Sequence, residues 1–270
     1  MTSDFTPSAI GVIGAGIMGE ALISALIASG VSPTSITISE KRDDRASELM
    51  AKYGVHSASL ESNVAQAQVL LLVVKPQDMA SLLEEIKGVL NPSAVIVTFA
   101  AGKKIDFIAS ILGGKRSIIR VMPNTPALVG EGMAAISSGP DVAPSHTQFV
   151  RGFLEATGQV VEVDEKLQDA VTAVSGSGPA YFFAFIEAMV SAGVDLGLTS
   201  EVATQLSIQT MVGAAKLLTT SGKSATTLRE NVTSPNGTTA AALASFNDAQ
   251  LGKIVKSAMR AARDRSQELA

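Results

Sequence analysis

The sequence predicts an α/β fold in two parts, a doubly wound sheet in residues 1–164 followed by an all-helical domain in residues 165–270. Short apolar runs alternate with helical runs through the first part, which implies right-handed crossovers and a mainly parallel sheet. This strand pattern stops after Asp164, and only helical segments follow. A glycine turn, Gly14–Gly19, joins the first strand to the first helix.

Composition limits the class of protein. Of the 270 residues, 46% are hydrophobic, 4% are aromatic and none is cysteine, and the net charge is −4. These values exclude a mainly disordered chain, disulfides and thiol chemistry; we expect a cytoplasmic protein with no nucleic-acid partner. We expect no signal peptide, because residues 1–8 are polar and no basic region precedes an apolar core. We expect no membrane span, because no apolar run reaches ~18 residues. The mean hydropathy of +0.31 is high for a monomer, so we expect a subunit interface.

The first strand, 9–13, runs through the glycine turn into a helix over 19–29 that stops at Gly30. The turn fits the dinucleotide fingerprint of a Rossmann-type domain. Gly14 allows the tight turn, Gly16 the close approach of a pyrophosphate, and Gly19 the packing of helix on strand. The pyrophosphate then binds free N–H groups at the helix start.

The second strand, 35–39, ends where the adenosine ribose of a dinucleotide lies. A carboxylate there accepts from the 2′-hydroxyl of NAD, whereas cations and hydroxyls hold the 2′-phosphate of NADP. Glu40 offers the first chemistry, about 20 residues after the glycine turn. The second is offered by Ser39, Lys41, Arg42 and Arg45. The cations outnumber the acid, which slightly favours NADPH over NADH. A solvated helix start is the alternative interpretation of these charges.

The remaining segments of the first part continue the alternation. In order they are helix 45–53, strand 69–74, helix 82–90, strand 94–99, helix 105–112, strand 117–122, strand 133–138, helix 144–156 and strand 159–163. The unbroken apolar runs predict parallel strands that are buried on both faces. Ligands bind beyond the carboxyl ends of such strands. The residues that we expect to hold the cofactor are therefore Gly14, Gly16, Ile17, Met18, Gly19, Ser39, Lys41, Arg42, Val74, Lys75, Pro76, Ala100, Ala101, Gly102 and Asn124.

The second part contains helical segments at 165–174, 179–196, 200–221, 224–231, 237–246 and 248–269. Several are apolar nearly all round, which is typical of helices buried in a larger assembly. Two polar stretches interrupt them. The stretch 174–180 is either a tight interhelical turn or a place of close backbone approach. The stretch 231–240 opens a helix with four hydroxyls, and is either an ordinary N-cap or an anion site that fits a small carboxylate.

The candidate catalytic residues are few. The two histidines, His56 and His146, lie in an expected turn and on a polar helix, and we interpret both as surface residues. No metal-binding cluster and no nucleophile elbow is present. A dehydrogenase acting on an alcohol usually needs a general base, and none is evident. Reduction of an imine suits this site, because a protonated C=N bond already accepts hydride and a hydroxyl need only hold the nitrogen.

The chain resembles the pyrroline-5-carboxylate reductase family over essentially its whole length. The motifs that carry the resemblance are 14–19, 74–76, 100–102, 120–126, 175–181 and 231–239, of which the last three together are specific. The resemblance implies a Rossmann domain and a helical dimerisation domain like that of 6-phosphogluconate dehydrogenase. It also implies homodimers, which often assemble into rings of five, and reduction of 1-pyrroline-5-carboxylate to L-proline by NADPH or NADH without a metal.

The resemblance implies roles for particular residues as well. Lys75 and Asn124 would lie near the nicotinamide and its ribose. Thr239 would be catalytic, with its hydroxyl facing the ring nitrogen. The substrate would be bound by Ser234, Asn236, Gly237, Thr238 and Thr239. One departure is Asn236, since many relatives have glycine there; asparagine tolerates a left-handed backbone, so we expect only a local change.

Two other functions compete with this interpretation. A 3-hydroxyacid dehydrogenase of the 6-phosphogluconate dehydrogenase type shares the glycine turn and the helical domain, but it uses a lysine after its Gly-x-Gly, and residues 179–182 contain none. A non-catalytic NAD(P)-sensing module would bind the cofactor without turnover and would not need the cluster 234–239.

Overall fold

The computed structural model describes residues 5–269, which form two compact units. The first unit holds the chain up to Ser177 together with the C-terminal segment from Ala262, and the second is Gly178–Ala261. The predicted boundary at Asp164 differs from this division. Residues 165–177 and the last turns of the C-terminal helix belong with the sheet, because polar side chains such as Gln168 and Ser266 are buried there.

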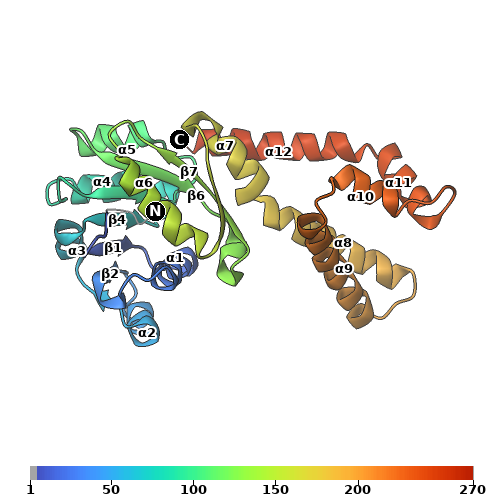
Figure 1. Ribbon diagram of the computed structural model, residues 1–270, viewed down its shortest axis with the longest axis horizontal. Helices are drawn as coiled ribbons and strands as arrows, with labels where there is room; N and C mark the ends of the chain where they lie inside the picture. Colours follow the sequence, from blue (N-terminus) through green and yellow to red (C-terminus); the bar gives the residue numbers. More distant parts are fainter. Residues whose placement is uncertain (1–4, 270) are drawn as a thin grey trace. The chain divides into compact units, whose positions relative to one another are not determined.

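An eight-stranded sheet forms the centre of the first unit (Figure 1). Its strands are β1 (Ile10–Ile13), β2 (Ile36–Ser39), β3 (His56–Ser57), β4 (Val69–Leu72), β5 (Val95–Thr98), β6 (Ser117–Met122), β7 (Gly132–Ser138) and β8 (Gly158–Glu162). Their order is β3-β2-β1-β4-β5-β6-β7-β8. All neighbours are parallel except β6 and β7, which are antiparallel. The connection 123–131 is too short for a crossover helix, so β7 reverses direction.

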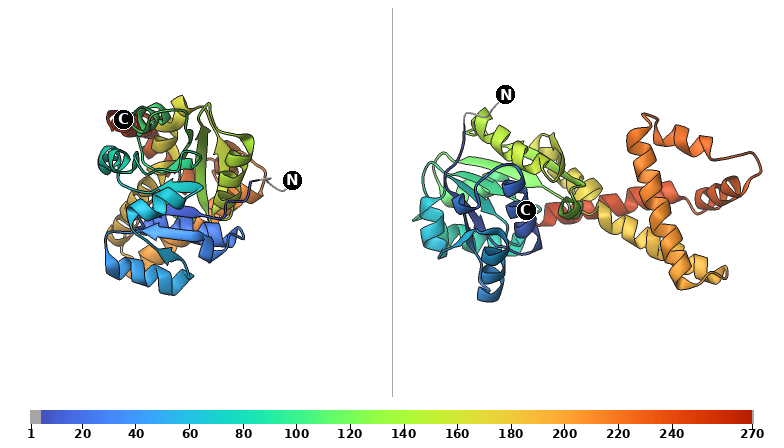
Figure 2. Two further views of the ribbon diagram at one scale, coloured as in Figure 1. Left: turned by 90° about the vertical axis from the view of Figure 1, so that its left-hand side faces the viewer. Right: turned by 60° about the horizontal axis from the view of Figure 1, so that its bottom comes forward.

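Helices cover both faces of this sheet (Figures 1 and 2). The helices are α1 (Ile17–Ala28), α2 (Asp43–Tyr53), α3 (Leu60–Gln66), α4 (Met79–Ile86), α5 (Ile105–Leu112) and α6 (Pro144–Glu155). One apolar core contains residues of α1, α2 and α6, and another contains residues of α3, α4 and α5. Leu71 faces the first core and Leu70 the second, as the alternation along a strand requires. The prediction of strands buried on both faces is confirmed for β4 and β5, and β1 is buried in the same way.

The sequence prediction missed β3 and α3. A two-residue strand and a seven-residue helix are too short to show a periodic pattern. Ser59 caps α3, since its hydroxyl oxygen accepts a hydrogen bond from the Ser62 N–H at 3.3 Å. His56, expected in a turn, lies on β3 with its side chain exposed. Short 3₁₀ helices were missed too, at Pro33–Ser35, Pro76–Asp78, Thr125–Val129 and Glu165–Leu167.

The helix expected over 165–174 is a more irregular segment. The 3₁₀ turn is followed by α7 (Gln168–Val171) and a π-helical turn, Thr172–Gly176. The Ser177 N–H donates to the Thr172 carbonyl at 2.8 Å, a five-residue step. The polar stretch 174–180 is therefore not an interhelical turn, because the chain stays helical from Glu165 to Asp195. By length and hydropathy alone this helical stretch could cross a membrane, although the sequence prediction expected no membrane span.

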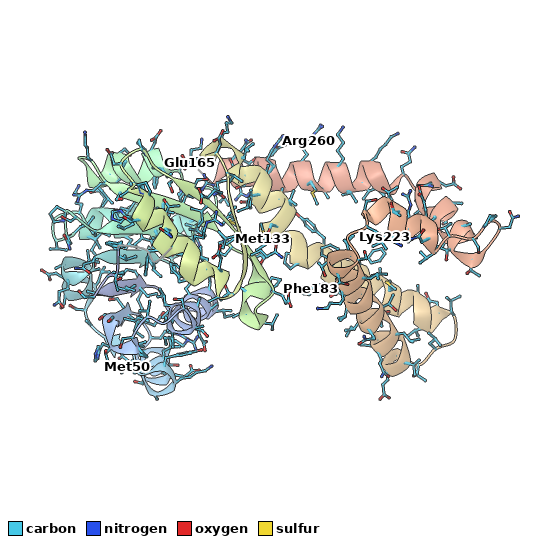
Figure 3. All side chains as sticks on the ribbon, in the orientation of Figure 1. Met50, Met133, Glu165, Phe183, Lys223 and Arg260 are labelled. Carbon is cyan, nitrogen blue, oxygen red and sulfur yellow. The ribbon has the colours of Figure 1, made fainter. Side chains whose placement is uncertain are left out.

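The second unit is entirely helical. It contains α8 (Gly178–Asp195), α9 (Ser200–Thr220), α10 (Ala225–Asn231), α11 (Thr238–Asp248) and the beginning of α12 (Leu251–Glu268). The first two, labelled in Figure 1, pack against each other. Large apolar side chains on them remain exposed within one chain, including Phe182 at 61% and Phe183 at 58%, the latter labelled in Figure 3. Such a surface needs a partner to cover it.

Candidate active site

The three glycines of the turn after β1 have different structural roles. Gly14 has φ +88°, and a Cβ atom on it would lie 2.7 Å from the Val73 carbonyl oxygen. A Cβ atom on Gly19 would lie 2.3 Å from the Gly14 carbonyl oxygen. The fold itself therefore requires both of these glycines. A Cβ atom on Gly16 would meet nothing within 4 Å, so the absent side chain leaves an open surface for a ligand.

The start of α1 presents backbone donors beside that open surface. Gly16 is the N-cap and no side chain caps the helix; the first helical hydrogen bond runs from the Glu20 N–H to the Gly16 carbonyl. Within residues 5–269 the N–H groups of Ile17, Met18 and Gly19 have no backbone acceptor. Free N–H groups at the positive end of a helix bind phosphate. The site therefore fits the pyrophosphate of a dinucleotide.

Two charged side chains hold the peptide groups of Ala15. Its N–H donates to Glu40 Oε2 at 2.9 Å, and its carbonyl accepts from Arg45 Nε at 3.1 Å. Arg45 is 9% exposed and is ion-paired with Glu20 and Glu48. The expectation that Arg45 binds the 2′-phosphate was wrong, because this guanidinium is buried and hydrogen-bonds to the glycine turn through the Ala15 carbonyl.

Glu20 collects donors from α2. It accepts hydrogen bonds from Arg45, from Lys52 Nζ at 2.8 Å and from Tyr53 Oη at 2.9 Å. The bond from Lys52, followed by that from Arg45, lowers the pKa of Glu20 to about 2. Only the ionised carboxylate can accept all of these bonds, so the link between α1 and α2 requires charge on Glu20.

We expect Glu20→Gln to lower the free energy of unfolding at neutral pH by about 1–2 kcal/mol, a value kept small because Lys52 is half exposed. The folded-state pKa of Glu20 is depressed, so its contribution is present above the unfolded pKa of about 4.3 and is lost as the pH falls toward about 2. Urea unfolding of both proteins between pH 7 and pH 2 checks this. A difference that stays constant over this range would contradict the ion-pair explanation.

A cleft of about 560 Å³ lies at the carboxyl ends of β1, β2 and β4. The register pairs Ile13 with Ser39 and with Leu72, and β1 is the point where the strand order reverses, the usual place for a ligand. The cleft brings together the predicted residues Gly14, Gly16, Ser39, Lys41, Val74 and Lys75. Residues that the sequence reasoning missed also line it, namely Ser59, Leu60, Asp78, Ser81, Leu82 and Glu85. They lie at the start of α3 and in or just before α4, for which the fingerprint has no position.

The polar groups at the end of β2 are engaged to different degrees. The Ser39 hydroxyl donates to the Ala58 carbonyl and accepts from Asn63 Nδ2, both at 3.0 Å. Glu40 accepts from two backbone N–H groups, those of Ala15 and Arg42. The side chains of Lys41 and Arg42 are exposed. Lys41, which lines the cleft, and the neighbouring Arg42 are thus exposed cations at this end of the cleft.

The other predicted cofactor residues lie outside the residues that line this cleft. Asn124 Oδ1 accepts from the Met133 N–H at 2.8 Å, and its Nδ2 donates to Ser175 Oγ at 3.2 Å. The π-helical turn is thereby fastened to the end of β6. Ala100, Ala101 and Gly102 follow β5, and Pro76 begins a 3₁₀ helix after β4. These segments extend the same edge of the sheet.

The stretch predicted to bind the substrate lies in the second unit. Gly237 is the N-cap of α11, no side chain caps this helix, and the Gly237 N–H donates to the Ser234 carbonyl at 3.1 Å. A Cβ atom on Gly237 would lie 2.4 Å from Ser234 Oγ. Asn236 adopts the left-handed backbone expected of it, with φ +59°. Thr238 is exposed and Thr239 half-buried. The hydroxyls therefore do not serve as an ordinary N-cap.

His146 differs from its prediction. It is half-buried, its Nδ1 lies 3.0 Å from Ser117 Oγ, and its ring meets that of Phe5. Burial lowers the pKa of this imidazole. The surface interpretation was only partly right, because contacts with Ser117 and Phe5, which come from segments distant in sequence, leave the ring half-buried. Among residues 5–269 no group of histidine and carboxylate side chains could hold a metal ion.

The sheet, the uncapped start of α1 and the adjacent cleft define a dinucleotide-dependent oxidoreductase. Residues 9–102 match the family "NADP oxidoreductase coenzyme F420-dependent", and residues 165–269 match "Pyrroline-5-carboxylate reductase dimerisation". The chain belongs to the pyrroline-5-carboxylate reductase family. The second match assigns the long helical stretch 165–195 to a dimerisation domain, and the chain therefore self-associates.

Full-length relatives support this membership. A pyrroline-5-carboxylate reductase of Corynebacterium melassecola is 40% identical over 264 residues, covering 96% of this chain and 98% of that protein. The structure of the Coxiella burnetii reductase has a TM-score of 0.90 at 33% identity, covering 98% and 99% of the two chains. The Plasmodium falciparum reductase, solved with NADP bound, has a TM-score of 0.86 at 28% identity, covering 100% and 99%.

Proposed function

We propose that this protein reduces the cyclic imine 1-pyrroline-5-carboxylate to L-proline, with the hydride supplied by a nicotinamide dinucleotide. The observation that carries the proposal is the start of α11, where three hydroxyls and an uncapped helix start occur on a segment without a charged side chain. Free N–H groups at such a start suit a small carboxylate. Membership in the reductase family supports the same substrate.

In the proposed reaction the chain binds, orients and holds rather than acting as a strong base. The start of α1 binds the pyrophosphate, and Lys75 and Asn124 lie toward the nicotinamide ribose. The backbone N–H groups of Thr238 and Thr239, with Ser234, hold the substrate carboxylate. The Thr239 hydroxyl would face the ring nitrogen and hold its proton in place, and a bound nicotinamide dinucleotide would supply the hydride for the adjacent carbon. Holding both reactants in one geometry is itself a large part of the rate.

The direct test is an absorbance assay at the nicotinamide band with 1-pyrroline-5-carboxylate, together with detection of L-proline. Consumption of the reduced cofactor with stoichiometric proline supports the proposal. Cofactor binding without consumption, by a protein shown to be folded, would contradict it and favour a redox-sensing module. Turnover of a 3-hydroxyacid but not of the imine would favour a dehydrogenase of the 6-phosphogluconate dehydrogenase type.

We propose NADPH as the preferred cofactor. Glu40 is occupied by two backbone donors, whereas Lys41 and Arg42 are exposed at the cleft end where the adenosine ribose is expected. The family description for residues 9–102 names NADP, and the P. falciparum relative was solved with it. A phosphate dianion gains from two nearby cations, while a hydroxyl gains little.

We expect the double variant Lys41→Ala/Arg42→Ala to lower kcat/KM for NADPH by on the order of tenfold or more and to leave kcat/KM for NADH within about twofold, since each exposed charge contributes about 1 kcal/mol or less. Steady-state kinetics with both cofactors measure this. Lys87→Ala/Lys104→Ala, which removes two exposed lysines elsewhere on the first unit, controls for net charge. Equal losses with both cofactors would contradict the assignment of these cations to the 2′-phosphate.

We further propose that the functional unit is a homodimer, that dimers assemble into a ring of five, and that the protein is cytoplasmic. The exposed apolar side chains of α8 and α9 support the dimer, and the absence of cysteine fits a reducing compartment. Sedimentation velocity at micromolar concentration gives the number of subunits. A fully active monomer would contradict the dimer, and activity confined to a membrane fraction would contradict the location.

A further inference from the structure

A buried polar cluster links the C-terminal end of α12 to the sheet of the first unit. Its members are Arg120 on β6, Glu165, Asp169 on α7, and Ser266 on α12. Arg120 and Ser266 are each 2% exposed, and Asp169 is 7% exposed. Asp169 Oδ1 accepts from Ser266 Oγ at 2.8 Å, across 97 residues of sequence, and from Arg120 Nη2 at 3.3 Å.

The loop after β5 contacts this cluster at two points. Gly102, with φ +76°, is buried under the C-terminal turn; a Cβ atom on it would lie 2.6 Å from the Ser266 carbonyl oxygen and 2.8 Å from Leu269 Cβ. At the other end of the loop, the Ile105 N–H at the start of α5 donates to Glu165 Oε1 at 2.7 Å. The same carboxylate oxygen lies 3.5 Å from Arg120 Nη1, and Glu165 is labelled in Figure 3.

The loop has a position in the sheet that matters for the cofactor. β5 pairs with β4 so that Thr98 lies opposite Leu72. Ala100–Gly102 therefore leaves the sheet beside the segment that carries Val74 and Lys75, which line the cleft. The loop Ala100–Gly102 has only two methyl groups and a hydrogen as side chains. Its shape therefore depends on the groups that pack against it, such as Ser266 and Leu269.

A buried ionic cluster is a costly way to stabilise a fold, since apolar residues of similar volume often do as well. Unlike an apolar contact, the hydrogen bonds of this cluster fix the orientation of the groups that they join. Ser266 and Arg120 each donate to one carboxylate oxygen, which fixes the last turn of α12 over Gly102. A loose apolar contact would let that turn slide and the loop move with it.

We propose that Asp169 and Ser266 are positioning residues for hydride transfer, which hold the loop Ala100–Gly102 in its reactive shape through the C-terminal turn of α12. Neither residue touches cofactor or substrate. The inference rests on the proposed function, because it takes this loop as the nicotinamide side of the cofactor site. The adenosine side, at the end of β2, is independent of the cluster.

The test compares Ser266→Ala and Asp169→Asn with wild type. The readouts are kcat, KM for NADPH and for 1-pyrroline-5-carboxylate, and the dissociation constants of NADPH and of 2′,5′-ADP, which carries only the adenosine end. We expect kcat to fall by on the order of tenfold or more, because small misplacements of reactants cost up to about 10²-fold. Affinity for 2′,5′-ADP should stay within about twofold of wild type. Ser257→Ala, exposed on the same helix, and the exposed Asp164→Asn serve as matched controls.

Two results would overturn the proposal. One is a lowered melting temperature of Ser266→Ala and Asp169→Asn with kcat and KM unchanged at temperatures where both variants are folded. This result would make the cluster purely structural. The other is a parallel loss of NADPH and 2′,5′-ADP binding, which would indicate general damage to the domain. If the wild-type protein binds NADPH and 2′,5′-ADP but does not turn over the imine, the proposed function is contradicted independently of the positioning role. In that case, a rise in the ratio of the NADPH dissociation constant to the 2′,5′-ADP dissociation constant in the variants supports the positioning role of Asp169 and Ser266. An unchanged ratio overturns it.

Discussion

Thr239→Ala is expected to lower kcat by on the order of 10²-fold, while the dissociation constant of NADPH stays within about twofold of wild type. Thr239 lies in the first turn of α11, half-buried, on a helix start that no side chain caps. In the proposed reaction its hydroxyl faces the ring nitrogen of the imine. Loss of one hydrogen bond made to the transition state costs about 3–4 kcal/mol, which corresponds to 10²–10³-fold in rate.

Matched variants separate this chemical role from a structural one. Thr239→Ser keeps the hydroxyl and should retain most of kcat. Thr226→Ala removes an exposed threonine from α10 and should leave the kinetics unchanged. Single-turnover experiments at saturating substrate isolate the hydride step from product release. An unchanged hydride step in Thr239→Ala would remove the Thr239 hydroxyl from the mechanism and leave the proposed carboxylate site, Ser234 with the backbone N–H groups of Thr238 and Thr239, untouched.

Gly16→Ala is expected to weaken binding of NADPH and NADH together by about tenfold to 10²-fold. The added Cβ atom meets no protein atom within 4 Å, so it should occupy the space that the pyrophosphate needs, and forced overpacking costs about 1–3 kcal/mol. The backbone of Gly16, with φ −65°, is open to alanine. Stability should therefore change by about 1 kcal/mol or less.

Fluorescence titration with each cofactor and thermal unfolding of the free protein test this prediction. Gly152→Ala is the matched control, because a Cβ atom there also meets nothing within 4 Å but lies on α6; its cofactor affinity should equal that of wild type. Gly19→Ala provides the contrast, since its Cβ atom would collide with the Gly14 carbonyl and lower both stability and affinity. Wild-type affinity in folded Gly16→Ala would mean that the pyrophosphate binds elsewhere.

The sequence by itself determined the fold class and every strand of the sheet except β3. Unbroken apolar runs such as 69–72 and 95–97 are typical of strands covered on both faces, and the glycine spacing is a local property of one turn. The predicted bounds of α5 and β6 are confirmed residue for residue. The sequence also indicated the family, because the three specific motifs 120–126, 175–181 and 231–239 can be identified from their residues and order alone.

Only the tertiary structure decided which polar groups are free. Arg45 and Lys41 are indistinguishable as cations in the sequence, yet Arg45 is enclosed by Glu20 and the Ala15 carbonyl while Lys41 stays exposed. Gly102 reads as part of a ligand loop, but its missing side chain makes room for Ser266. Both outcomes depend on contacts between segments far apart in the chain. Burial, and with it the cost of leaving a charge unpaired, arises only when those segments pack together.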